Sequence, residues 1–481
     1  MAQDVARGEA GFDAHSIEQI PEADRDSTGW QQFWIWAGAN IAPINWILGA
    51  LGIVLGLGLT ETILVIVIGN LVGCAIFASL TVMGHQTGVN QMVLSRSPFG
   101  RRGGYLSSWL QFLMTMGWIG VNTYFPVVLA VAILGHFGVN DSFGVKFIVV
   151  TVIMIIQVGI GVYGFYLIRS FEKYTVPVVF GIMGLMSILA WTRHGMRQLG
   201  PDLAPARRGP LLRHLRAGDR DRHRLGDLVG HLGLGLLRFV RPTVSSRSVF
   251  WYSYAGLFVP TVWLAVLGAS IASVTQSADP AKLVSSVFGG VVAVLVMLLV
   301  LHGPIATNIL NVYSSALAGP VGRHQAPRRV LGLIAGVVGY AVTLYFVYSP
   351  DFAVNFDNWM VSLVLWMSPW VGVVLADYYL LRRKQIDVAQ LYADPKASIY
   401  GDVNWVGIGA FLLGLVCGWL FLFGLVGPLQ GYVSGTSCSG GDLSWLVGIV
   451  VAGGVYLIGM RGKVAATPAR ELTGAAGQPK A

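Results

Sequence analysis

The sequence predicts an all-α membrane protein with twelve transmembrane helices. Three observations support this prediction: the composition, the lengths of the apolar runs and the placement of the basic residues. Hydrophobic residues make up 54% of the 481 residues and charged residues only 11%, whereas soluble domains carry about a quarter charged residues. Most apolar runs reach about 18 residues, which is enough for a helix to cross a bilayer. The short alternating strands of a membrane barrel are not seen.

Eleven of these runs are clear candidate spans, and they form two sets separated by a stretch of different composition. The first set is Phe33–Leu59, Thr62–Met83, Tyr105–Leu134, Phe147–Leu167 and Tyr174–Trp191. The second set is Phe250–Ala272, Val284–Ser315, Val330–Val347, Trp359–Leu381, Trp405–Gly424 and Leu443–Met460.

The basic residues gather in alternate loops, which the positive-inside rule assigns to the cytoplasm. This alternation holds only if one more span lies between Trp191 and Arg238. We therefore expect twelve spans in one transmembrane domain, residues 31–460. A polar tail, 1–30, and a disordered tail, 461–481, flank it, both in the cytoplasm. The basic loops hold Arg96, Arg101 and Arg102; Arg169 and Lys173; Arg238, Arg241 and Arg247; Arg323, Arg328 and Arg329; and Arg382, Arg383, Lys384 and Lys396.

The expected sixth span falls on an anomalous Arg-rich segment, residues 193–237. From Arg193 to Leu236 there are nine Arg, four His and four Asp, and each Arg at mid-membrane costs about 2.5–3.5 kcal/mol. One interpretation is a solvated basic loop. We favour a frame shift in the gene, because GC-rich DNA read out of register encodes this mixture of Arg, Gly, Pro, Leu, His, Ala and Asp. The chain would then lack its sixth helix, and a non-transporting product of a damaged gene is the alternative to a working transporter.

The first span contains Ala37, Asn40 and Pro43 within the run WIWAGANIAPINW. Gly and Pro weaken a helix, and a discontinuous membrane helix exposes carbonyl groups and helix-end dipoles to solutes and cations. A plain proline kink is the alternative interpretation.

The third and eighth spans carry polar side chains where lipid or packing contacts are expected. Trp118 and Asn122 lie four residues apart, hence on one helix face, and offer an aromatic face and an amide to a flat heterocycle. In the eighth span Asn308 and Asn311 share a face with Thr307 and His302 nearby. Ordinary packing and interhelical hydrogen bonds are the alternative for the amides, and a neutral, hydrogen-bonded ring is the alternative to proton coupling for His302. No Asp or Glu is expected at mid-membrane, which argues against a carboxylate proton relay.

Five stretches resemble the nucleobase:cation symporter-1 family, in its purine-cytosine permease branch. The resemblance implies a leucine-transporter-like five-plus-five inverted repeat followed by two C-terminal helices. It also implies import of cytosine, a purine or a related heterocycle, driven by sodium ions or protons. The stretches are FWIWAGANIAPINW at Phe33–Trp46, TGVNQMVLSRSPFGRRG at Thr87–Gly103, GWIGVN at Gly117–Asn122, TNILNVYSS at Thr307–Ser315 and ADYYLLR at Ala376–Arg382.

The same resemblance assigns roles to individual residues. Trp118 stacks on the base, Asn122 and Asn308 bind its edge, and Asn311 and Asn40 support them. The coupling cation is expected near Ala37, Asn40 and Thr307. Sodium-coupled members tend to have a serine where this chain has Ala306, so we expect protons, with His302 as the coupling residue. The residues that carry these roles are Trp118, Asn122, Asn308, Asn311, Asn40, Ala37, Thr307 and His302.

The expected partners are a nucleobase-like solute and the lipid of the plasma membrane. We expect no cofactor beyond the coupling ion, no bound metal, no nucleic acid and no obligatory protein partner. A membrane-embedded enzyme is the remaining alternative. It would need a metal cluster, a nucleophile pair or a carboxylate dyad within the spans, and the sequence contains none at a credible place.

Overall fold

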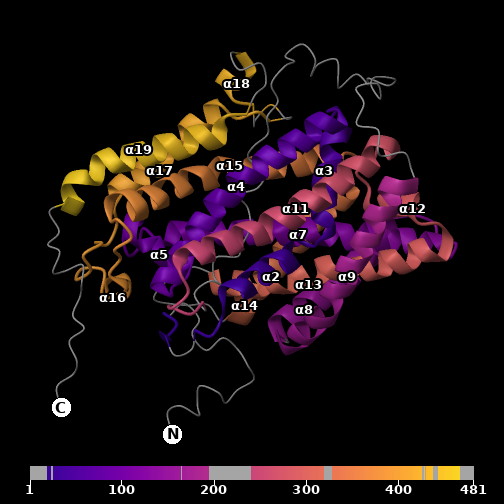
Figure 1. Cartoon of the computed structure of the whole chain (residues 1–481), viewed down its shortest axis with the longest axis horizontal. Helices are drawn as coiled ribbons and strands as arrows, with labels where there is room; N and C mark the ends of the chain where they lie inside the picture. The colour runs from indigo at the N-terminus through magenta and orange to yellow at the C-terminus, as the bar shows by residue number, and fades with distance from the viewer. Residues whose placement is uncertain are drawn as a thin grey trace, which may run out of the picture.

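The protein is a bundle of long helices (Figure 1). The computed structural model describes residues 19–22, 25–163, 165–193, 240–318, 328–424, 427, 430–436 and 442–465. The helices are α2 (Gly29–Asn40), α3 (Pro43–Val54), α4 (Leu59–Thr87), α5 (Gln91–Leu94), α6 (Arg96–Phe99), α7 (Tyr105–His136), α8 (Phe143–Tyr163), α9 (Phe165–Arg193), α11 (Ser246–Thr275), α12 (Pro280–Val287), α13 (Gly290–Ala318), α14 (Arg328–Tyr348), α15 (Phe352–Leu375), the π-helix η5 (Ala376–Leu381), α16 (Val388–Tyr392), α17 (Trp405–Leu420), α18 (Tyr432–Thr436) and α19 (Ser444–Ala465).

All eleven clear spans fall on helices. In the described part of the chain, eight helices are long and apolar enough to cross a membrane, and the bent pair α2–α3 makes a ninth. The expected fifth and eleventh spans fall on the shorter apolar helices Pro177–Thr192, within α9, and α17. The described residues do not include the expected sixth span, so they do not test the frame-shift hypothesis. The C-terminal tail beyond Ala465 also lies outside them.

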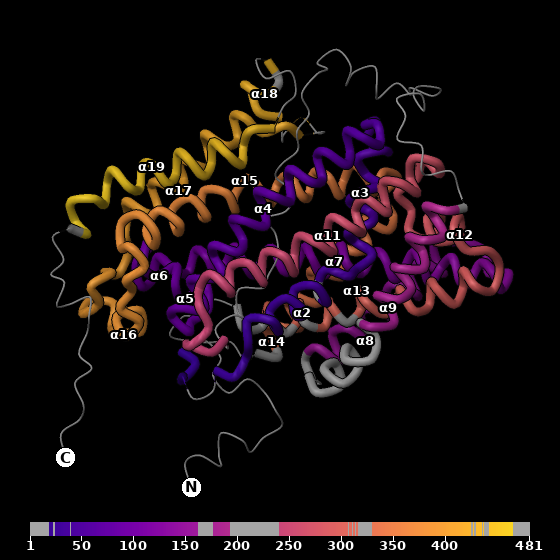
Figure 2. Tube along the Cα trace, viewed as in Figure 1, coloured from indigo at the N-terminus to yellow at the C-terminus, as the bar shows by residue number. Residues whose placement is uncertain are grey.

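The bundle has enclosed central helices and peripheral helices with bare apolar faces. In their most apolar stretches α7 is 67% buried and the α15–η5 span 72%, whereas α8 is only 22% buried. Helix α8 exposes large apolar side chains such as Ile148 and Ile155, as expected where lipid replaces water. Figure 2 shows α7, α11 and α13 running through the middle, and α17 and α19 pack together along α15 on one flank (Figure 1).

The first span is two helices, α2 and α3, as the discontinuous-helix interpretation predicted. The boundaries of some later spans differ from those expected. The run Val284–Ser315 begins in α12, a separate helix that ends at Val287, and α13 starts only at Gly290, whose φ of 52° interrupts the chain. Helix α15 begins at Phe352 rather than Trp359, so Asp357 lies inside a helix, where it is 4% exposed. Asp357 was expected outside the span and instead lies in the second turn of α15.

The break in the first span lies between Asn40 and Pro43. Proline lacks an N–H and clashes with the preceding turn, and the axes of the two segments differ by 60°. Two side chains bind to carbonyl groups at the break: the amide of Asn45 donates to Asn40 O at 2.6 Å, and the amide of Asn40 donates to Trp36 O at 2.8 Å. Thr261 of α11 donates to Asn40 Oδ1 at 3.2 Å, which fixes the break against a neighbouring helix.

Helices α3 and α11 touch through their backbones at two glycines. A Cβ on Gly49 would lie 1.8 Å from Ala265 O, and a Cβ on Gly268 would lie 1.7 Å from Trp46 O. Small residues permit such close approach of membrane helices. Because no side chain separates the two helices here, the position of α3 after the break is determined by α11.

A buried ion pair ties α15 to its neighbours at one end of the bundle. Asp377, which is 1% exposed, accepts hydrogen bonds from Arg382 Nε at 3.0 and 2.9 Å and from Tyr456 of α19 at 2.7 Å. Ser97 of α6 also donates to this carboxylate. The wide turn of η5 surrounds the pair, because Arg382 N donates to Asp377 O, five residues back.

The loops around this ion pair form a junction, here called the basic end. Arg101 N and Arg102 N donate to Gly401 O and Asp402 O at 2.9 and 2.8 Å. Arg96 is 3% exposed, donates to Leu391 O at 3.0 Å, and has its pKa lowered to about 10 by burial. Thus two basic loops that lie far apart in the sequence meet at this end.

The N-terminal segment joins the same end. Ile20 N donates to Gly88 O at 3.0 Å, and the buried guanidinium of Arg25 donates to Ile20 O at 3.1 Å. Ser27 pairs with the strand-like segment at Val240, and Arg241 N donates to Ser27 O at 2.9 Å. The segment therefore connects the end of α4 to the start of α11.

We expect Asp377→Asn to lower the free energy of unfolding by about 3–5 kcal/mol, because it leaves the buried charge of Arg382 uncompensated. Thermal unfolding of the detergent-solubilised protein measures this. Asp402→Asn is the matched control, because Asp402 pairs with Arg102 at 3.2 Å with its side chain 41% exposed, and exposed pairs contribute only about 0–1 kcal/mol. Equal melting shifts for the two variants would contradict a stabilising role for the buried pair.

Candidate functional site

Trp118 and Asn122 lie side by side on the enclosed face of α7. They are 2% and 7% exposed, and Trp118 belongs to the largest cluster of buried apolar side chains, together with Ile44 of α3 and Met360 of α15. Within the described residues, the Asn122 side chain makes no recorded hydrogen bond. The aromatic face and the amide predicted from their spacing are thus next to one another in the interior, where α3, α7, α13 and α15 meet.

A second indole lies against the same turn of α7. A Cβ on Gly117 would lie 1.8 Å from Cη2 of Trp359, so this α15 side chain rests directly on the α7 backbone beside Trp118. The ring depends on the absence of a side chain at position 117. Trp359 therefore brings α15 into contact with the candidate site.

Aromatic rings close α7 against the start of α15, just beyond Asn122. Tyr124 and Phe352 stack with ring centroids 3.7 Å apart and an interplanar angle of 3°. Phe125 meets Phe352 edge-on at 5.8 Å, and Phe356 stacks on Phe352 at 5.5 Å. These contacts separate the Trp118–Asn122 pair from that end of the bundle.

Asn308 is engaged in a buried polar network between α7, α8 and α13. Its Nδ2 lies 2.9 Å from Ile119 O, 2.8 Å from Thr123 Oγ1 and 3.3 Å from Gln157 Oε1. Its Oδ1 accepts from Asn311 Nδ2 at 3.1 Å. Asn308 is fully buried and Asn311 is 5% exposed. Asn308 thus contacts α7 at Ile119 and Thr123, the residues that directly follow Trp118 and Asn122. Its amide, however, already has protein partners on both sides.

The expected cation residues lie on both sides of the helix break. Ala37 O accepts the ordinary helical bond from Ile41 N at 3.0 Å, and Asn40 is held by Trp36, Asn45 and Thr261 as described above. On α13, Thr307 donates to Gly303 O at 3.1 Å. A Cβ on Gly303 would lie 4.0 Å from Cδ of Pro43, so this turn of α13 approaches the break.

Two titratable side chains lie close in the sequence to residues of the candidate site. His302 precedes Gly303 on α13 and is half-buried. Asp357 lies two residues before Trp359 on α15 and is buried. His302 was a predicted site residue and Asp357 was not, because the expected span begins only at Trp359.

Four further residues at the site were not predicted from the sequence: Thr123, Gln157, Thr261 and Trp359. A signal existed for Gln157, because an amide in the middle of the apolar run of α8 is costly in lipid and indicates a polar partner. Thr261 and Trp359 gave no such signal, since threonine and tryptophan are common in membrane helices. Their roles come from which helices pack together.

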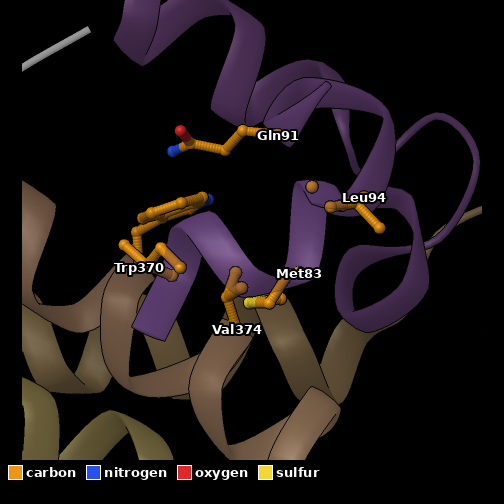
Figure 3. A pocket seen from close by; sticks show the side chains of 7 residues that line it. Met83, Gln91, Leu94, Trp370 and Val374 are labelled. Atoms are coloured by element: carbon orange, nitrogen blue, oxygen red, sulfur yellow. The ribbon is translucent and has the colours of Figure 1, made fainter. Parts of the chain in front are cut away.

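A separate small pocket lies near the basic end, between α4, α5 and α15. Figure 3 shows the Gln91 amide above the Trp370 indole, with Met83, Leu94 and Val374 around them. It has room for about one water molecule. The residues around it belong to a different buried cluster from Trp118, so this pocket is not the site predicted from the sequence. Across the described residues, no three His, Cys, Asp or Glu side chains could hold a metal ion.

Known proteins that resemble this chain belong to one family of permeases. The profile of permeases for cytosine/purines, uracil, thiamine and allantoin matches residues 19–211 and 237–448. YxlA of Bacillus subtilis, which is named as a purine-cytosine permease, is 25% identical over 462 residues, covering 93% of this chain and 95% of its own. The cytosine permease of Escherichia coli strain K12 is 26% identical over 410 residues, covering 84% and 86%.

The fold agrees with that of a solved transporter. Mhp1, a nucleobase-cation-symport-1 family transporter in a closed conformation with bromovinylhydantoin bound, superposes with a TM-score of 0.69 at 19% identity, covering 94% of this chain and 95% of Mhp1. This likeness confirms the leucine-transporter-like inverted-repeat fold. The count of twelve helices is not confirmed, because the expected sixth lies outside the described residues.

We expect Gly117→Ala to destabilise the protein by about 1–3 kcal/mol, the usual cost of overpacking, because the added methyl group displaces the Trp359 ring. Melting temperature in detergent is the measurement. Gly135→Ala on the same helix is the control, since a Cβ there meets no atom within 4 Å. A Gly117→Ala protein as stable as Gly135→Ala would show that Trp359 does not rest firmly on α7.

Proposed function

The chain belongs to the family of permeases for cytosine/purines, uracil, thiamine and allantoin, and on this premise we propose that it imports cytosine, a purine or a related flat heterocycle. It is a multi-pass membrane transporter of the nucleobase/cation symporter type and not an enzyme. The base, the direction and the coupling ion are the parts that we propose.

The observation that carries the substrate proposal is the Trp118–Asn122 pair on the enclosed face of α7. Stacking on an indole suits any flat ring, and an amide can pair with both a donor and an acceptor on the ring's edge. The indole of Trp359 on the adjacent turn supplies a further apolar wall. In this proposal Trp118 stacks on the base and Asn122 binds its edge. The two α13 amides exchange the roles expected from the sequence: Asn311 contacts the base, and Asn308, whose amide already has protein partners, lies behind it.

We place the coupling cation at the break between α2 and α3, facing α13. The proximity of Gly303 and Pro43 supports this position, because Thr307, the carbonyl groups near Ala37 and Asn40, and His302 then lie on adjoining elements. Protons are our proposed ion. Ala306 offers no hydroxyl oxygen for sodium, while His302 offers a titratable ring and Asp357 a buried carboxylate on α15.

We propose that the basic end faces the cytoplasm of a cell whose plasma membrane holds the protein. The contacts at this end support the proposal, since loops rich in Arg and the N-terminal segment meet there, as the positive-inside rule requires. Both termini would then be cytoplasmic. Labelling of a cysteine placed at Arg101 by a membrane-impermeant reagent from outside intact cells would overturn this orientation.

A second proposal is that the chain is a non-transporting product of a damaged gene. It is supported by the family match, which omits residues 212–236, within the Arg-rich segment. Resequencing tests it: an unshifted reading frame, together with uptake of a base by the unaltered chain, would exclude it.

Uptake of radiolabelled cytosine and adenine by a transporter-deficient host tests the proposed function. We expect Trp118→Ala and Asn122→Ala to raise the half-saturation concentration roughly ten-fold or more, since stacking on a base or an unpaired buried amide is worth about 1–3 kcal/mol. Trp109→Ala is the matched control, because Trp109 lies on the same helix and is 47% exposed. Wild-type kinetics in both site variants would move the site elsewhere.

The coupling ion has its own test. If protons drive uptake, the rate rises as the external pH falls and is unaffected when sodium is replaced by choline. His302→Ala should then remove the dependence on pH, because histidine is the side chain that changes charge near neutral pH. Sodium dependence at constant pH that persists in His302→Ala would show that sodium is the coupling ion.

A further inference from the structure

The orientation of the Asn308 amide is determined by a backbone carbonyl. Ile119 O lies 2.9 Å from one end of that amide, and a carbonyl oxygen can only accept. The end near Ile119 must therefore be the nitrogen, and the other end, Oδ1, must be an acceptor. Exchange of the two ends would bring two oxygens together without a proton in a fully buried place, which is costly.

The orientation of the Asn308 amide also determines the orientation of the Asn311 amide. Because Asn308 Oδ1 is an acceptor, the atom of Asn311 that meets it at 3.1 Å must be Nδ2. The oxygen of Asn311 then lies on the side of the amide away from Asn308. Throughout the described residues, this Oδ1 accepts no recorded hydrogen bond, and Asn311 is 5% exposed.

Thr123 and Gln157 hold Asn308 in this orientation. Thr123 Oγ1 accepts from Asn308 at 2.8 Å, and its single proton is directed to Ile119 O at 2.7 Å or Gln157 Oε1 at 2.9 Å. Gln157 Oε1 is 3.3 Å from Asn308 Nδ2. Asn308 Nδ2 therefore has two acceptors besides Ile119 O. Neither Thr123 nor Gln157 has a role in the proposed substrate site.

We propose that Thr123 and Gln157 are positioning residues that lock the Asn308 amide and thereby present Asn311 to the solute as a hydrogen-bond acceptor. The chain should then select heterocycles that carry an N–H on the edge facing α13 over the same rings with those N–H groups methylated. This inference rests on the proposed function, because it takes Asn311 to contact the solute.

A purely structural role for the network predicts something different. If Thr123 and Gln157 only hold α7, α8 and α13 together, their loss lowers the amount of active protein and affects all solutes alike. If they help Ile119 O to lock polarity, the loss of either removes one of the three acceptors that hold the Asn308 nitrogen. Both amides are then held less firmly, and the preference for N–H groups weakens. The ratio of two inhibition constants separates these cases and does not depend on the amount of protein.

The experiment compares cytosine with 1,N4,N4-trimethylcytosine, which has no N–H, as competitors of radiolabelled cytosine uptake by the full chain. The measured quantity is the inhibition constant of trimethylcytosine divided by that of cytosine. We expect this ratio to fall roughly ten-fold in Thr123→Val and in Gln157→Met, both of which keep the size of the side chain. Thr123→Ser keeps the hydroxyl and should keep the ratio.

Thr115→Val is the matched control. Thr115 lies on the same helix, is fully buried and donates only to Gln111 O, at 2.8 Å, so its loss should leave the ratio unchanged. An unchanged ratio in Thr123→Val and Gln157→Met, with cytosine uptake intact, overturns this inference alone. Absence of cytosine uptake by the unaltered chain overturns both this inference and the proposed function.

Discussion

The carboxylate of Asp377 is the contact on which one half of the bundle depends. It accepts from side chains on α6, α19 and the end of η5, and so joins the loop after α4, the helix that lines the candidate site and the C-terminal pair. A buried charge of this kind is expensive unless every partner is in place. Its cost therefore opposes sliding of α15 along α19 at the basic end, because such sliding would break the contact between Asp377 and Tyr456. At the other end of α15, apolar contacts take over: Phe352 stacks on Tyr124 and Trp359 rests on Gly117.

The sequence predicted the helices well and their ends less well, for a physical reason. Hydropathy measures transfer of a segment to lipid, so it identifies Tyr105–Leu134 as a span regardless of neighbours. It does not distinguish α12 from α13, because Val284, Val287 and Phe288 lie directly before the apolar run of α13. Asp357 was misassigned because a charge usually ends an apolar run, whereas its burial depends on how α15 packs.

The candidate site was predicted in part. The helical spacing of Trp118 and Asn122 was sufficient to place them on one face, and that face is enclosed. The spacing of Asn308 and Asn311 also predicted a shared face, but it gave no information on their partners. Whether an amide is free for a solute depends on the carbonyl opposite, here Ile119 O on α7, and that pairing follows from helix packing. Trp359 was missed for the same reason, since its position depends on Gly117 of another helix.

The docking of the N-terminal segment has a consequence for synthesis of the chain. Arg241 reaches Asp26 O across a separation of 215 residues, so the segment's partner leaves the ribosome long after the segment itself. At about 5–20 residues per second, the first residues wait on the order of tens of seconds before that contact can form. Until then the segment can contact only the end of α4, where Arg25 donates to His85 O, and its backbone partner at Arg241 is missing. Closure of the basic end therefore comes late in the biogenesis of this protein, only after the helices from α2 to α9 have been synthesised.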